Sequence, residues 1–241
     1  MQQKFHPLVL LGIILGGSFL IATVVGAMTV FRLRSLNDTV SVTGSAKMEV
    51  TADQAKWITQ ISRTVRESNL KSGYEQIARD LEITKSFMKG QQIADTELNI
   101  SPVSMNEVYQ QNQSAEKLYS LTQVLTVSTM DVDRVTNASK NLATVVGQNV
   151  IFSSLSLEYY YSKLPETRIT LLSQAIDDAK ARAGEIAKNS GKDVGTLKSA
   201  SSGVVQVQSR NSTDVSDYGS YDTSQIEKQV TVTVKAAFSL K

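Results

Sequence analysis

The chain has no cysteine and only one histidine, His6, among its 241 residues. The absence of cysteine excludes disulfides, thiol nucleophiles and thiolate metal sites. Because His6 stands at the extreme N-terminal end, the rest of the chain has no histidine to serve as a general base or a zinc ligand. The sequence therefore predicts a body that folds without a metal or cofactor and that is not an enzyme.

A strong charge of either sign is also missing. The chain has 25 Lys and Arg against 23 Asp and Glu, and three of the 25 precede Asn37, which leaves 22 basic residues in the remainder. Because basic and acidic residues are nearly equal in number, the composition gives no sign of the strongly basic surface that binds nucleic acid. We therefore expect no nucleic-acid partner.

Charged residues are absent from the 24 residues of Leu8–Phe31. As a helix, this run extends about 36 Å, enough to cross a hydrocarbon core of about 30 Å. A cleaved signal peptide is the alternative, since Lys4 supplies a basic end and Val25-Gly26-Ala27 offers a small-residue cleavage site. A retained anchor is favoured because the run is longer than a signal peptide's apolar region and continues past Ala27.

Gly12, Gly16 and Gly17 place small residues at helical spacing inside this run, the pattern that lets two membrane helices approach closely. They are the candidate residues for membrane helix packing. Basic residues flank the run on both sides, so the positive-inside rule does not decide its orientation. We expect residues 1–34 to be the membrane anchor and residues 35–241 to be a separate body.

The body alternates between the strand period and the helix period. Apolar and polar residues alternate, as in half-buried strands, at 40–51, 57–61, 155–161, about 202–208 and 230–240, and a hairpin is expected over 97–129. Helical spacing occurs at about 70–89, at 131–146 after the N-cap Asp131, and from Pro165 to about 190. This pattern predicts an α+β fold, with antiparallel or mixed sheet packed against long amphipathic helices, arranged either as one body or as two lobes.

Two faces are specific enough to be tested. In the last of these helices, the apolar stripe is expected to be formed by Ile169, Leu172, Ile176, Ala179, Ala183 and Ile186. In the strand at 155–161, Leu155, Leu157, Tyr159 and Tyr161 are expected to share the buried face. The polar stretch at 210–225 has no period and is expected to be a surface loop.

Three segments together resemble the SIMPL-domain family. They are VSVTGSAKMEVTADQAKW at the start of the body, VSTMDVDRVTNASKNLATVVGQNVIFSSLSLEY in its middle, and LLSQAIDDAKARAGEIAKNSGKDVGTLKS after it. The resemblance covers about residues 40–241. It implies an α+β fold, a location outside the cytoplasm, self-assembly into hollow oligomers in some relatives, and no catalytic residues.

Several residues could carry chemistry, but each pattern fits a plainer role. Asp177 and Asp178 are adjacent on a helix and point about 100° apart, so they do not form a facing acid pair. The spacing of Asp214, Asp217 and Asp222 does not match a calcium loop. Asn189-Ser190-Gly191-Lys192 ends a helix rather than starting one, which is unlike a phosphate loop.

The run Tyr159-Tyr160-Tyr161 could stack on sugars or bases. Alternation leaves only Tyr160 exposed, so packing is the favoured role of this run.

The sequence thus favours a non-enzymatic protein anchored in the cytoplasmic membrane and acting through self-assembly or partner binding. The resemblance implies that its C-terminal domain lies in the periplasm. The membrane and further copies of the chain are its expected partners. One alternative is a module that binds a small ligand. The other is a carboxylate-based hydrolase, for which Glu158, Asp177 and Lys180 are the available residues. A concave site with convergent polar groups would favour the alternatives over assembly.

Overall fold

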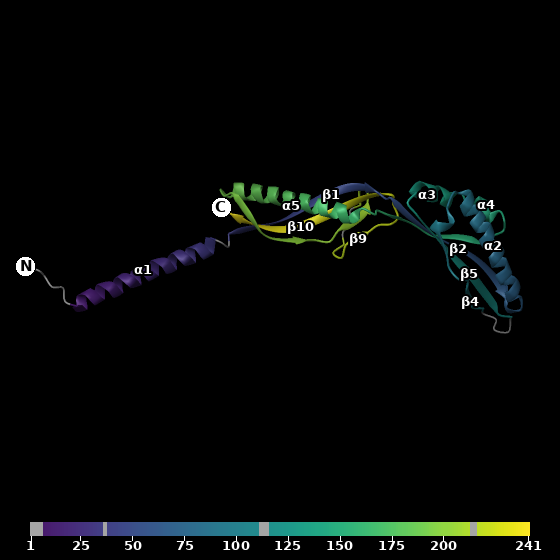
Figure 1. The fold of residues 1–241 in the computed structure, drawn as a ribbon, viewed down its shortest axis with the longest axis horizontal. Helices are drawn as coiled ribbons and strands as arrows, with labels where there is room; N and C mark the ends of the chain where they lie inside the picture. The colour runs from purple at the N-terminus through teal and green to yellow at the C-terminus, as the bar shows by residue number, and fades with distance from the viewer. Residues whose placement is uncertain (1–6, 36–37, 111–115, 213–215) are drawn as a thin grey trace, which may run out of the picture. The chain divides into compact units, whose positions relative to one another are not determined.

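The computed structural model describes residues 7–35, 38–110, 116–212 and 216–241, which divide into two compact units (Figure 1). Unit 1 comprises Met1–Ala46, Leu171–Gly203 and Val232–Lys241, and unit 2 comprises Lys47–Thr170 and Val204–Thr231. The elements in chain order are α1 (Pro7–Ser35), β1 (Thr39–Thr51), β2 (Gln54–Arg66), η1 (Glu67–Asn69), α2 (Leu70–Gly90), η2 (Asp95–Glu97), β3 (Leu98–Ile100), β4 (Ser104–Val108), β5 (Leu118–Thr129), α3 (Val132–Lys140), α4 (Ala143–Val146), β6 (Phe152–Tyr160), α5 (Leu164–Asn189), β7 (Val194–Ser202), β8 (Gln206–Ser209), β9 (Ser220–Tyr221) and β10 (Glu227–Leu240).

The apolar N-terminal segment forms the helix α1. Among the residues that the structure describes, no helix combines the length and apolar character expected of a membrane span. No described atom lies within 4 Å of a Cβ built at Gly12, Gly16 or Gly17, so the space beside these glycines is open.

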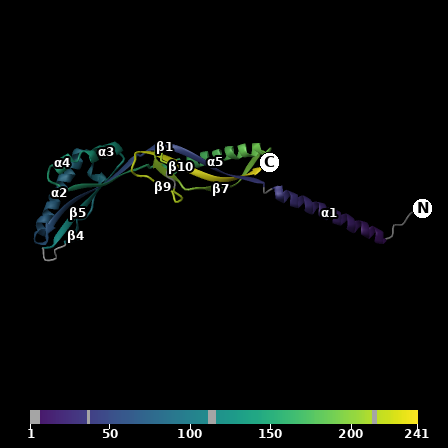
Figure 2. The same cartoon turned by 180° about the vertical axis from the view of Figure 1, so that it is seen from behind.

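In unit 1, β10 pairs with β1 and, antiparallel, with β7 (Figure 2). Helix α5 packs on this sheet through small side chains, because Ala175, Ala179 and Ala183 share a buried cluster with Phe238 and other apolar residues. The approach is closest at Gly44, where an added Cβ would lie 2.1 Å from the carbonyl oxygen of Ala175. Only glycine permits the helix to come this near to the strand.

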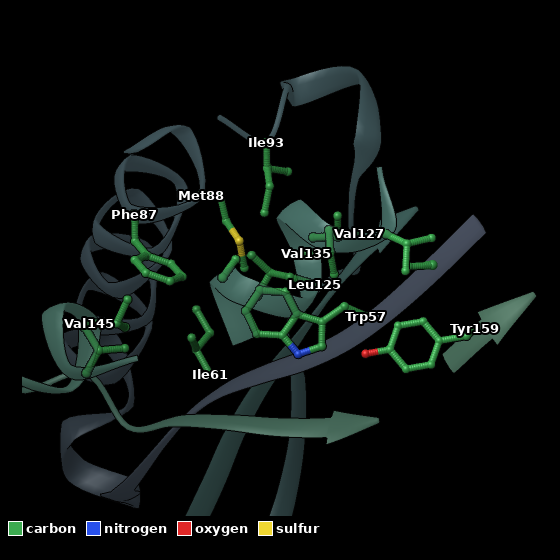
Figure 3. Packing of buried hydrophobic residues seen from close by; sticks show 14 of the residues in the cluster. Trp57, Ile61, Phe87, Met88, Ile93, Leu125, Val127, Val135, Val145 and Tyr159 are labelled. Carbon is green, nitrogen blue, oxygen red and sulfur yellow. The ribbon is translucent and has the colours of Figure 1, made fainter. Parts of the chain in front are cut away.

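Unit 2 contains a second sheet in the order β3-β5-β2-β6, with β4 also paired to β5. Strand β2 is antiparallel to both of its neighbours. Large side chains fill the core beside this sheet. Figure 3 shows the indole of Trp57 among Ile61, Met88 and Leu125, and Trp57 has no exposed surface. The indole Nε1 donates a hydrogen bond to Ser154 Oγ at 2.8 Å, so the polar atom of this buried ring is satisfied.

Strands β8 and β9 complete unit 2. Strand β8 is antiparallel to the Lys228–Thr231 part of β10 and parallel to β9. The polar stretch expected to be a loop therefore contains a short strand, while part of it lies outside the described residues.

The α+β class is confirmed, as are the helix at 70–89 and the hairpin, which β4 and β5 form. The last strand is also confirmed, since Val230, Val232, Val234 and Phe238 are all buried. Asp131 is the N-cap of α3, accepting a hydrogen bond from the backbone N–H of Arg134 at 3.0 Å.

The apolar stripe expected on the last helix was wrong at both ends. Ile169 is 71% exposed and Ile186 is 50% exposed, while Leu171, Ala175 and Ala187 are buried. The pattern of large apolar residues misled the prediction, because the close approach of α5 to the sheet requires small side chains at the contact.

Several smaller predictions were also wrong. The helix expected at 131–146 is two helices, α3 and α4. Leu155 is exposed, because it is the extra residue of a bulge between the pairs that join β6 to Ile58 and Thr59 of β2. Tyr161 lies beyond the end of β6. Strand β7 was missed, and the strand expected at 202–208 is limited to β8.

Candidate functional site

A hollow of about 720 Å³ lies in unit 2, where β2 begins and where β5 and β6 end. Strand pairing explains why these chain segments meet, since Ala55 of β2 lies opposite Thr129 of β5 and Gln54 lies opposite Tyr160 of β6. The polar side chains that line the hollow are Gln54, Lys56, Glu97, Ser128, Thr129, Asp131, Arg134 and Tyr160. The sequence places these residues far apart, and the sheet brings them together.

The guanidinium of Arg134 ties the rim of this hollow together. Its Nη2 donates to Glu97 Oε1 at 2.6 Å and to Thr129 Oγ1 at 2.9 Å, and its Nη1 donates to the carbonyl oxygen of Gln92 at 2.6 Å. The buried Nε has no hydrogen-bond partner, although it lies 3.5 Å from Asp131 Oδ2, within the range of an ion pair. Charge-assisted bonds of this kind hold a rim in one geometry.

Glu97 is the acid of this network. Burial is the largest single influence and raises its pKa, but the hydrogen bonds from Thr129 and from the backbone of Ala94, with the charge of Arg134, bring the pKa below its ordinary value. The carboxylate therefore stays ionised at neutral pH and is engaged by its neighbours, so it is not a free general base.

A second hollow, of about 540 Å³, lies along β3 and shares Glu97 and Ser128 with the first. Lys56 of β2 lies opposite Ser128 of β5 on one side and Glu158 of β6 on the other. No described group pairs with the Lys56 ammonium. The cation is therefore available at the end of this strand.

Tyr160 closes the other side of the larger hollow. Its hydroxyl donates to Glu158 Oε2 at 2.7 Å, and this bond, with burial and the carboxylate charge, raises the pKa of Tyr160 to about 12. Its ring centroid lies 5.9 Å from that of Tyr221, with the ring planes at 33°. The phenol is thus fixed and neutral.

The residues considered for a hydrolase belong to two different units. Glu158 lies in unit 2, where it accepts hydrogen bonds from Ser156 and Tyr160. Asp177 and Lys180 are exposed on the part of α5 that belongs to unit 1.

The described members of the two acidic patterns serve as hydrogen-bond acceptors or lie at the surface. Asp178 caps the backbone N–H of Ser45 at 2.8 Å, which is the main reason that its pKa is lowered. Asp222 accepts from the backbone and hydroxyl of Ser224, and Asp214 lies outside the described residues. Within the described ranges, no group of three His, Cys, Asp or Glu side chains is arranged to hold a metal ion.

Of the three tyrosines in the run, Tyr159 is buried, as expected. Asn189 and Gly191 lie at the C-terminal end of α5, so the helix-end interpretation of that motif is confirmed. Sequence reasoning missed Glu97 and Arg134. One signal was present: Arg134 stands in the first turn of a helix, where the helix dipole disfavours a cation unless a carboxylate lies beside it.

The family model for SIMPL, described as a protein of unknown function (DUF541), matches residues 40–238. This match covers most of the chain, so the protein belongs to the SIMPL family, as the three sequence segments suggested. No curated protein matches the chain. The function must therefore be argued from the site.

Proposed function

We propose that this SIMPL protein is a membrane-anchored, non-enzymatic binding protein whose body lies outside the cytoplasmic membrane. The observation that carries the proposal is the hollow at the end of the unit 2 sheet, where polar groups from four chain segments converge. Concave sites with a few placed polar groups are the usual form of ligand sites.

The state of these groups favours binding over turnover. Glu97, Thr129 and Arg134 are bonded to one another, which gives a stiff rim but no nucleophile paired with a base. Lys56, the exposed Met130 and the ring of Tyr160 are the groups left to face a partner. Such a mixture of one cation, a thioether and an aromatic ring suits recognition.

Anchoring through α1 is the second part of the proposal. Its support is the sequence of Leu8–Phe31, 24 residues without a charge that lie within the helix α1. N-terminal sequencing of protein extracted from membranes should begin at or near Met1. A start at Met28 would show that the segment is a cleaved signal peptide. Protease added to intact spheroplasts should digest the body, and protection of the body would place it on the other side.

Self-association is a second candidate function, and exposed apolar side chains in unit 1 favour it. Ile186 of α5 and Leu197 of β7 are each about half exposed. A chain beginning at Ser35 should remain oligomeric in light scattering, while Gly12→Leu with Gly16→Leu should weaken only the association of the full chain in detergent. A monomeric shortened chain with an oligomeric full chain would assign association to α1 alone, and two monomers would remove this candidate.

A further inference from the structure

Unit 2 has another, smaller hollow of about 220 Å³ beside β8 and β9. The described residues that line it carry polar groups, and none of them is a cation; they are Gln208, Ser209, Ser212, Ser220, Tyr221 and Asp222. Among the described lining residues, the one charge is the carboxylate of Asp222, whose pKa is lowered mainly by the backbone N–H of Ser224. A hollow with this lining disfavours an anion and favours a neutral ligand that both donates and accepts hydrogen bonds.

Gln208 brings an unpaired hydrogen-bond donor to the lining of this hollow. The residue is only 9% exposed, yet its amide Nε2 has no hydrogen-bond partner. A buried donor without an acceptor lowers the stability of the folded state by about 1–3 kcal/mol, so folded proteins rarely contain one. A ligand oxygen in the hollow would supply the missing acceptor.

The two tyrosines link this hollow to the larger one. Tyr221 lines the small hollow, Tyr160 lines the hollow of about 720 Å³, and their ring centroids are 5.9 Å apart. Both rings are held in place. The Tyr221 hydroxyl accepts a hydrogen bond from the backbone N–H of Tyr161 at 2.8 Å, and the Lys228 ammonium lies 5.7 Å from the Tyr221 ring centroid.

Lys228 has a supporting role in this arrangement. It is 1% exposed, and its Nζ donates a hydrogen bond to the backbone carbonyl of Asp222. Burial lowers its pKa, and the nearby Asp222 charge opposes that effect. The ammonium thus fixes the backbone and the ring that form one wall of the small hollow, without lining the hollow itself.

We propose that the Tyr160–Tyr221 pair and the two hollows beside it form one binding site for a neutral carbohydrate chain. Sugars offer hydroxyls whose oxygens accept hydrogen bonds, which match the unpaired amide Nε2 of Gln208. They also offer apolar C–H faces, which pack against rigid aromatic rings. Two hollows, each lined by one ring of an aromatic pair, suit a ligand of several linked units rather than a single one.

The charges of the larger hollow agree with a neutral chain. Two cations, Lys56 and Arg134, and two carboxylates, Glu97 and Asp131, give its described lining no net charge, although both carboxylates lie against Arg134 and the Lys56 ammonium pairs with neither. The inference rests on the proposed binding function of this hollow and names the class of ligand. It does not rest on the membrane anchor, so a failure of anchoring would leave it standing.

The test is isothermal titration calorimetry on the full chain in lauryldimethylamine oxide, a detergent without a sugar headgroup. The probes are chitotetraose and maltotetraose, two neutral chains of four sugars. We expect at least one to bind with a Kd below about 1 mM. Tyr160→Ala and Tyr221→Ala should each weaken binding at least about fivefold, the effect of losing one aromatic contact.

Tyr218→Ala is the matched control, because Tyr218 is 97% exposed and lines neither hollow. Its affinity should stay within twofold of the parent chain. Tyr221→Phe guards against misfolding, since it keeps the ring and should keep most of the affinity. Gln208→Leu, which removes the unpaired donor, should weaken binding while it leaves the melting temperature equal or higher.

Two results would overturn the inference. One is the absence of binding by both probes at 10-fold above the expected limit of about 1 mM. The other is binding that the tyrosine and Gln208 variants leave unchanged, which would place the ligand elsewhere on the chain. Loss of affinity in Tyr218→Ala to the same extent as in Tyr221→Ala would count equally against it.

Discussion

Helix α5 packs in unit 1 through alanines and against one glycine, whereas the core of unit 2 is filled by tryptophan, phenylalanine, methionine and leucine side chains. The closest approach in unit 1 is between backbones, at Gly44 and Ala175. In unit 2 the central group is the indole of Trp57, which is fully buried (Figure 3). One chain therefore has two kinds of core. In unit 1, helix and strand approach so closely that only small side chains fit between them, and in unit 2, large side chains fill the space beside the sheet.

This difference has a consequence for mutation. An added methyl group should destabilise the closely packed core of unit 1, because the helix or the strand must move to make room. Removing atoms from a large side chain should destabilise the core of unit 2, because a cavity remains. The hollows with polar linings described above belong to unit 2, where a rigid core supports the strand ends that carry the site.

The largest effect is expected from Trp57→Ala. Removing a fully buried indole should cost about 3–5 kcal/mol in the free energy of unfolding, since the transfer and cavity terms add. Hydrogen exchange followed by mass spectrometry should show faster exchange in β2, β5 and α2. Trp57→Phe, which keeps most of the apolar volume, should cost less than half as much. Equal costs for the two variants would mean that the indole does not fill the core as described.

Gly44→Ala should come next. Its new Cβ would lie 2.1 Å from the carbonyl oxygen of Ala175, so α5 must move, at a cost of about 1–3 kcal/mol. Faster exchange should be confined to α5, β1 and the unit 1 part of β10. The control is Gly184→Ala on the same helix, where the nearest atom would lie 4.0 Å away. This change should be neutral or should stabilise by up to about 1 kcal/mol, since alanine favours helix.

If Gly44→Ala and Gly184→Ala changed the free energy of unfolding equally, the close packing of α5 against Gly44 would not limit the size of the side chain there. The comparison between the two units would then lose half of its basis.

The smallest effect concerns pH and belongs to unit 2 alone. Because the pKa of Glu97 is lower in the folded chain than its ordinary value of 4.5, its contribution to stability is present above about pH 4.5 and is lost as the pH falls through the folded pKa. Solvent screening keeps this contribution below about 1 kcal/mol. Thermal unfolding between pH 7 and pH 3 should therefore show a shallower acid decline for Glu97→Gln than for the parent chain. Parallel declines would show that Glu97 is not held by Thr129 and Arg134.

Local periodicity was enough to predict much of the fold. The strand at Thr39–Thr51, the helix α2 and the strand β10 each alternate or repeat over a long span, so their type followed from spacing alone. The buried face of α5 could not be predicted from spacing. The contact with the sheet selects alanine for its small size, whereas hydrophobic patterns give more weight to isoleucine. Exposed Ile169 and buried Ala187 show the result.

The candidate site was harder to predict for a different reason. Glu97 and Arg134 belong to separate elements, and only the pairing of β3 with β5 brings them to the same end of the sheet. Tyr160 was identified as an exposed aromatic, but its partner Tyr221 lies 61 residues later, in a stretch without a period. Lys228 was not singled out, because nothing in an alternating strand indicates that a lysine will be buried.

The central claim is that unit 2 carries the binding function and unit 1 does not. Hydrogen exchange of the full chain tests it most directly, with and without whichever of the two tetrasaccharides binds, at a concentration near the Kd of the parent chain. The account predicts slower exchange at the start of β2, the ends of β5 and β6, and residues 216–222, with no change in α5 beyond Thr170 or in β7, and clearly smaller protection in Tyr160→Ala at the same ligand concentration. Protection confined to unit 1, or the same protection in Tyr160→Ala as in the parent chain, would contradict it.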